Sequence, residues 1–131
     1  MDSRIEKELL LQSRNPFVHH NGISVVSVDE NHSQAELVIR EDSLNPFGSV
    51  HGGALFTLAD LCSGVAARAD GRHYVTDQAS ISYLRGASQG RLLAKGTVLH
   101  RGRSRCVVDV KIYDEQDRLL STGTFSFFCK S

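Results

Sequence analysis

One carboxylate stands alone in a stretch of apolar and small residues. It is Asp60, the only charged residue in Ala54–Ala67. An ionised carboxylate is seldom buried without a partner that compensates its lost hydration. Just before this stretch, His51-Gly52-Gly53 places two glycines where a helix would begin. Helix N-termini present unpaired N–H groups and the positive end of the dipole, which bind negatively charged oxygen. A lone acid and an oxyanion-binding turn on one helix indicate acyl-transfer chemistry.

The two parts of this arrangement lie too far apart to act together within one chain. Asp60 follows Gly52 by eight residues, so the two are separated by about 12 Å along a helix that rises 1.5 Å per residue. If two copies packed these helices antiparallel about a two-fold axis, Gly52 of one copy would approach Asp60 of the other. We therefore expect a homodimer with two identical composite sites.

Composition narrows the class of protein. The 131 residues fit one domain with one core, and 15 Lys and Arg balance 15 Asp and Glu. Zero net charge gives no overall field that would favour nucleic acid or an anionic membrane. Cys62, Cys106 and Cys129 are dispersed, which argues against a disulfide framework and a structural zinc site. The polar N-terminus does not resemble a secretory signal, and no stretch fits a membrane span, so we expect a cytoplasmic protein.

The elements that must position Asp60 follow from hydrophobic patterning. A short amphipathic helix over Ile5–Leu11 ends at Asn15-Pro16, and a hairpin pairs Ile23–Val28 with the alternating run Gln34–Arg40. The long helix over Gly52–Ala69 is apolar on nearly all sides, so a sheet must wrap it. The remaining strands are expected over Tyr74–Leu84, Leu92–His100, Cys106–Tyr113 and Leu119–Phe128. The predicted fold class is α+β, with one antiparallel sheet around a long central helix.

At this point the sequence resembles a known family. Asn45, His51-Gly52-Gly53 and Thr57-Leu58-Ala59-Asp60 are similar to the signature of hotdog-fold acyl-CoA thioesterases of the phenylacetate-pathway type. Ile81-Ser82-Tyr83-Leu84-Arg85 is similar to the strand that follows the helix in that family. The resemblance covers Gly22–Phe128 and implies one hotdog domain over residues 1–131, with 1–21 as an N-terminal helix and lead-in. It also implies hydrolysis of acyl-CoA to free acid and CoA by a homotetramer built from two dimers, without a metal or redox cofactor.

The resemblance assigns catalytic roles to Asp60, Gly52, Asn45, His51 and Thr76. The Gly52 N–H would polarise the thioester carbonyl, with Gly53 beside it in the substrate-binding turn. Asp60 of the neighbouring chain would activate water or attack directly. Asn45 and His51 would orient substrate or water, and the Thr76 hydroxyl would hold the nucleophilic water. Gly86 departs from the family pattern, because many relatives have proline there.

Arginines are the candidate contacts to the phosphates of CoA. Arg101, Arg103 and Arg105 alternate, so an extended backbone would place them on one face. Guanidinium groups match phosphate geometry, so Arg101 and Arg103, together with Arg85, are candidate substrate-binding residues. The alternative is a charged hairpin edge that resists aggregation.

Two other functions use the same fold. A non-catalytic acyl-CoA binding or sensing module would bind without hydrolysis. A dehydratase or hydratase would need a histidine and an acid facing one β-carbon, whereas the only histidine near the helix, His51, precedes its first turn. The acyl group stays open between aryl and medium-chain acids, because pocket shape depends on how Leu55, Phe56 and Leu61 meet the strands of the partner.

Overall fold

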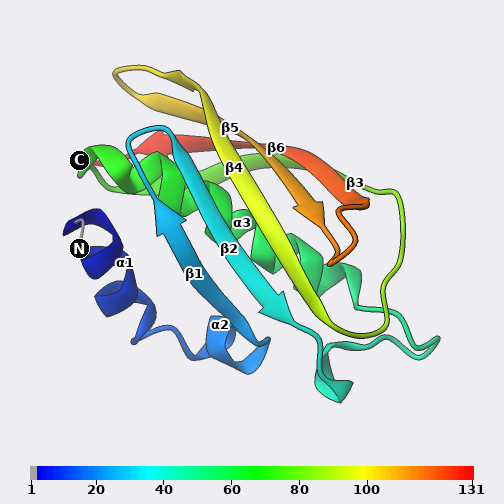
Figure 1. Ribbon diagram of the computed structural model, residues 1–131. Coiled ribbons are helices and arrows are strands. Elements are labelled where there is room, and N and C mark those ends of the chain that lie inside the picture. Colours follow the sequence, from blue (N-terminus) through cyan, green and yellow to red (C-terminus); the bar gives the residue numbers. More distant parts are fainter. Residues whose placement is uncertain (1–2) are drawn as a thin grey trace.

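A six-stranded antiparallel sheet curls around one long helix in the computed structural model, which describes residues 3–131 (Figure 1). The elements are α1 (Ser3–Gln12), α2 (Pro16–His20), β1 (Ile23–Val28), β2 (His32–Val38), η1 (Glu41–Ser43), α3 (Gly52–Ala67), η2 (Arg68–Asp70), β3 (Tyr74–Tyr83), β4 (Arg91–Arg101), β5 (Arg105–Tyr113) and β6 (Leu119–Cys129). The strand order is β1-β2-β4-β5-β6-β3. This confirms the predicted α+β class and the sheet around a central helix. Among residues 3–131, none of the helices combines the length and the hydropathy of a membrane-spanning segment.

Strand alternation explains why the sheet closes over α3. In β5 every second residue is buried, and these residues are Cys106, Val108, Val110 and Ile112. Phe125 and Phe127 of β6 are buried by the same two-residue period, and Leu58 of α3 is fully buried with them in one core. At Gly96 of β4, a Cβ would lie only 2.6 Å from the Ser33 hydroxyl, which donates to the Cys62 carbonyl oxygen, so a side chain here would displace the hydrogen bond that joins β2 to α3.

The C-terminal end of α3 is capped by an arginine from the sheet. Arg101 lies at the end of β4, and its Nη2 donates to the carbonyl oxygens of Ala66 at 2.7 Å and Ala67 at 3.4 Å. Its Nη1 donates to the carbonyl oxygen of Glu30 at 3.0 Å. A guanidinium at a helix C-terminus satisfies unpaired carbonyls and opposes the negative end of the dipole. Arg101 therefore stabilises the element that carries Asp60.

The N-terminal segment forms two helices where one was expected. Asn15-Pro16 was predicted to end the first helix, and α1 does end at Gln12. The same pair also begins α2, because the Asn15 side chain accepts a hydrogen bond from the Val18 N–H and Pro16 occupies the first helical position. Proline is as compatible with a helix start as with a helix end. The prediction of a plain lead-in over this segment was therefore wrong.

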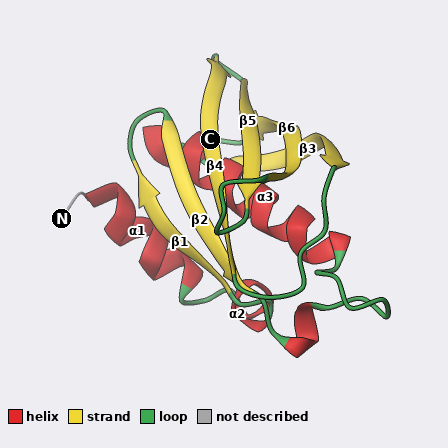
Figure 2. Cartoon of the chain, turned by 45° about the vertical axis from the view of Figure 1, so that its right-hand side comes forward, coloured by secondary structure: helices red, strands yellow, loops and turns green. Residues whose placement is uncertain are grey.

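One stripe of α3 is open, which corrects the expectation of a helix buried on nearly all sides. Gly53 is exposed, and Thr57 and Asp60 are partly exposed. Their spacing of four and three residues places them on one face. The neighbouring strand β3 forms one edge of the sheet (Figure 2), and its residues are exposed along most of its length. None of the three stripe residues is a large apolar one, so their spacing along one face was a signal in the sequence that the expectation of a helix buried on nearly all sides did not use.

Candidate active site

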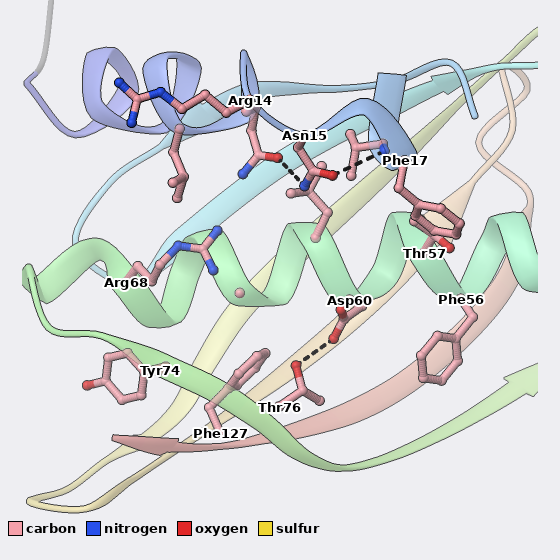
Figure 3. Close-up of a pocket in the computed structure, with 15 residues that line it drawn as sticks. Arg14, Asn15, Phe17, Phe56, Thr57, Asp60, Arg68, Tyr74, Thr76 and Phe127 are labelled. Carbon is pink, nitrogen blue, oxygen red and sulfur yellow. Dashed lines mark hydrogen bonds between the residues drawn. The ribbon is translucent and has the colours of Figure 1, made fainter. Parts of the chain in front are cut away.

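Asp60 points from the middle of α3 toward the edge strand β3. Its Oδ1 accepts a hydrogen bond from the Thr76 hydroxyl at 2.7 Å (Figure 3). A bulge between Thr76 and Gln78 interrupts the pairing of β3 with β6 at this point, and bulges re-aim the side chains next to them. Within residues 3–131, Asp60 forms no ion pair with a lysine, arginine or histidine. A neutral hydroxyl thus orients the carboxylate, and its charge is not neutralised.

A cleft of about 580 Å³, which we call the Asp60 cleft, lies beside this carboxylate. Its floor is α3, its wall is formed by β3 and β6, and its roof is α1 and α2 (Figure 3). The roof residues are Leu11, Gln12, Arg14, Asn15, Phe17 and Val18. Phe56 and Leu61 line the cleft as expected, whereas Leu55 does not line it and is buried in the core. The contribution of the N-terminal helices was missed, because nothing in their sequence indicates what they cover.

The turn before α3 has a defined hydrogen-bond pattern. His51 caps the helix, and its Nδ1 accepts a hydrogen bond from the Gly53 N–H at 2.9 Å. In the neutral imidazole this assigns the proton to Nε2, a donor that has no acceptor within residues 3–131. The Gly52 N–H has no acceptor among the described residues. A helix N-terminus with an unused N–H can bind an oxygen that carries negative charge.

The fold itself does not require glycine at position 52. Gly52 begins a regular helix, and a Cβ there would lie 3.5 Å from the Tyr83 ring, an ordinary contact distance. The Tyr83 hydroxyl donates to the Gly52 carbonyl oxygen at 3.0 Å and holds this first turn in place. Burial raises the pKa of Tyr83, which keeps the phenol protonated as a donor. The glycine leaves room on the outer side, where a ligand or a second subunit can approach the N–H.

Asn45 shapes the loop that leads to this turn. Its side-chain oxygen accepts hydrogen bonds from the N–H groups of Phe47 at 2.9 Å and Ser49 at 3.1 Å. The oxygen therefore acts as a turn former. The Nδ2 group has no acceptor among residues 3–131, so it is available to a ligand.

The predicted common face of arginines is not formed, because the chain reverses between β4 and β5. Gly102 N–H donates to the Arg105 carbonyl oxygen at 2.8 Å across this hairpin. Arg101 is used in capping α3, and Arg105 pairs with Asp77 of β3. Arg103 and Arg85 are exposed, and neither forms an ion pair in the described part of the chain. A role for any of them in binding CoA phosphates stays a prediction.

Asp60 and the Gly52 N–H both face open space but do not meet within one chain. Eight residues of α3 separate them, which corresponds to about 12 Å along the axis. The carboxylate can accept a proton or attack a carbon, and the helix N-terminus can stabilise an oxyanion. One small reacting group can contact both only if one of them comes from another copy of the chain.

The chain is similar to known thioesterases. A family model described as "Thioesterase superfamily" matches residues 47–121. The acyl-coenzyme A thioesterase PaaI of Escherichia coli is 32% identical over 101 residues, which are 76% of this chain and 72% of the relative. The proofreading thioesterase EntH of Cronobacter turicensis is 32% identical over 113 residues, which are 84% of this chain and 82% of the relative.

Two solved structures extend the comparison. The structure of PaaI from E. coli superposes with a TM-score of 0.92 at 24% identity, covering 98% of this chain and 95% of that one. A hypothetical thioesterase from Streptococcus pneumoniae, solved with coenzyme A, has a TM-score of 0.80 at 34% identity, covering 83% of this chain and 86% of that one.

Proposed function

The chain belongs to the thioesterase superfamily and has its hotdog fold, and from that premise we propose that it hydrolyses an acyl-CoA thioester to a free acid and CoA at a site shared by two subunits. One observation carries the proposal. A carboxylate without a cationic partner borders a cleft on α3, while the N–H that begins the same helix has no acceptor within residues 3–131. The solved S. pneumoniae relative that holds coenzyme A supports CoA as part of the substrate.

Asp60 supplies the base or the nucleophile. The Thr76 hydroxyl holds Oδ1 at 2.7 Å, which leaves Oδ2 for the reaction. As a base, the carboxylate takes a proton from water while the water oxygen forms a bond to the carbonyl carbon. The carbon–sulfur bond then breaks, and the proton passes to the departing CoA thiolate. As a nucleophile, Asp60 would attack the carbonyl carbon, the carbon–sulfur bond would break to release the CoA thiolate, and water would then hydrolyse the resulting mixed anhydride to the free acid and the Asp60 carboxylate.

The partner's helix start stabilises the charge on the carbonyl oxygen. The N–H of Gly52 and the positive end of the α3 dipole both point at the position of that oxygen in the composite site. His51 Nε2 and Asn45 Nδ2 are further donors near the same turn. Because these groups are fixed by the helix cap and the Asn45 loop, they require little reorganisation during the reaction.

Two open surfaces support the dimer. β3 is a ten-residue edge strand with exposed apolar side chains, including Val75 at 44% and Tyr83 at 49% exposure. An edge of this kind is suited to pairing with another strand, and here the partner is β3 of a second copy. The second surface is the start of α3, where Gly52 has no side chain and its N–H has no acceptor among the described residues. A two-fold axis along the β3 edge would run the two α3 helices antiparallel and so bring Gly52 of one copy toward Asp60 of the other.

A thiol-release assay tests this function. The native chain and Asp60→Asn are compared on short-chain, medium-chain and aryl acyl-CoA thioesters. The substitution keeps the shape and the hydrogen-bonding capacity of the side chain but removes its charge. We expect thiol release by the native chain and a loss of at least about 100-fold in Asp60→Asn, with unchanged thermal unfolding. Tight binding without release by the native chain would instead identify a sensing module.

A further inference from the structure

Two hollows lie along α3 on either side of one exposed aromatic residue. The first is the Asp60 cleft. The second, which we call the His51 hollow, has a volume of about 280 Å³ and is lined by Phe17, His20, Asn21, Asp42, Ser43, His51, Gly53, Ala54 and Thr57. The two linings share only Phe17 of α2 and Thr57 of α3. Figure 3 shows the Phe17 ring beside Thr57, so these two side chains form the wall between the hollows.

This wall is held in place from both sides. The Thr57 hydroxyl donates to the Gly53 carbonyl oxygen at 2.8 Å, which fixes its side chain against α3. Phe17 lies in α2, and the Asn21 side chain donates to its carbonyl oxygen at 2.8 Å. The next residue, Val18, is 4% exposed and anchors α2 in the core. The backbone of Phe17 is therefore held by a helix that packs into the core.

The hydrophobic core does not account for the position of the Phe17 ring. Phe17 is 65% exposed, whereas its neighbour Val18 supplies the buried contact of α2. An exposed aromatic side chain between two hollows has its apolar surface available to a ligand. On the side of Asp60 this surface continues over the apolar side chains of Val18, Phe56 and Leu61.

We propose that Phe17, with Thr57 below it, limits the length of the acyl group. In this proposal the thioester carbonyl lies at Asp60 and the acyl group fills the Asp60 cleft up to the wall. Aryl, short and medium-length acyl groups fit in front of the wall, and long fatty acyl groups are rejected. The inference rests on the proposed function, because it needs a substrate held at Asp60.

Replacing Phe17 by a smaller residue and by a larger one tests the wall. Phe17→Ala joins the two hollows, and Phe17→Trp enlarges the wall. Leu10→Ala is the matched control, because Leu10 is a large apolar residue of α1 with 63% exposure that lines neither hollow. The kcat/KM values for hexanoyl-, octanoyl-, decanoyl- and dodecanoyl-CoA are measured by thiol release for each variant and for the native chain.

We expect Phe17→Ala to raise the ratio of dodecanoyl to hexanoyl kcat/KM at least about 10-fold, since a single methylene is worth about 10-fold or more in an apolar pocket. Phe17→Trp should lower the ratio of octanoyl to hexanoyl kcat/KM, and Leu10→Ala should keep the native profile. A native profile in a folded Phe17→Ala variant would overturn the inference while hydrolysis by the native chain still supports the proposed function. If Phe17→Ala fails to fold, Phe17→Trp decides, and an unchanged profile there overturns the inference. No thiol release by the native chain would instead overturn the proposed function.

Discussion

Replacing Gly52 by proline should remove one hydrogen-bond donor and little else. Gly52 is the first residue of α3, where proline is favoured, and the preceding His51 has φ −65° and ψ 135°, the extended conformation that a residue before proline adopts. The N–H that proline lacks has no acceptor among the described residues. A Cβ at this position would be in ordinary contact with Tyr83. The fold should therefore accept Gly52→Pro, with a gain of about 0.4–1 kcal/mol from the stiffer unfolded chain.

The catalytic consequence should be large. Loss of one oxyanion donor costs about 10²–10³ in kcat, so we expect Gly52→Pro to lower kcat by that factor without a lower melting temperature. Gly52→Ala is the matched control, since it keeps the N–H and adds a methyl group near the substrate. Its effect should fall on KM more than on kcat. Steady-state thiol release and thermal unfolding measure both variants. A kcat for Gly52→Pro within about threefold of the native value would refute the assignment of this N–H as the donor.

Three further substitutions separate the roles of neighbouring residues. Thr76→Val removes the hydrogen bond to Asp60 and should lower kcat/KM about 10- to 100-fold with little change in unfolding, as expected for a hydrogen bond to a charged group. Arg101→Met uncaps α3 and should lower the free energy of unfolding by about 2 kcal/mol in denaturant titrations. Burial raises the pKa of Asp70, but hydrogen bonds, first among them that from Tyr74, hold it below its usual 3.8. The Asp70 carboxylate therefore stabilises the fold at neutral pH, and this contribution should fade as the pH drops below about 4 toward the lowered pKa. Acid unfolding curves of the native chain and of Asp70→Asn measure it, because the variant should lack this contribution at every pH.

Much of the fold could be predicted because its elements have clear periodicities. The strand Ile23–Val28 was predicted with its observed ends, and Leu119–Phe128 differs from the observed β6 by one residue. Both runs are rich in β-branched or aromatic residues, which favour strands, whereas the bulge between Val25 and Ser27 in the pairing of β1 with β2 was not predicted. The long helix was also predicted, although its last turn is the separate 3₁₀ turn η2. The family and the hotdog fold were identified from the residues around His51 and Asp60, and the comparisons confirm both.

The parts that were missed depend on contacts between distant residues. Glu8 is buried, and its carboxylate pairs with Arg68 through bonds of 2.9 and 3.1 Å that fasten α1 to the end of α3. Sixty residues separate this pair, and nothing local to either residue indicates it. Arg68 and the end of α1 both line the Asp60 cleft, so this pair joins its floor to its roof. Arg101 likewise resembles a solvated arginine in the sequence, because its role as a helix cap exists only once β4 returns beside α3.

If the acid and the oxyanion donor of each site come from different subunits, mixed dimers of two inactive variants should recover activity. Gly52→Pro and Asp60→Asn chains are each nearly inactive alone under this account. When they are mixed in equal amounts and allowed to exchange subunits, half of the dimers contain both variants. Each mixed dimer has one site with neither defect, so activity should rise to about a quarter of the native value. An activity that stays at the average of the two separate variants, with exchange verified by mass, would show that each site is built from one subunit.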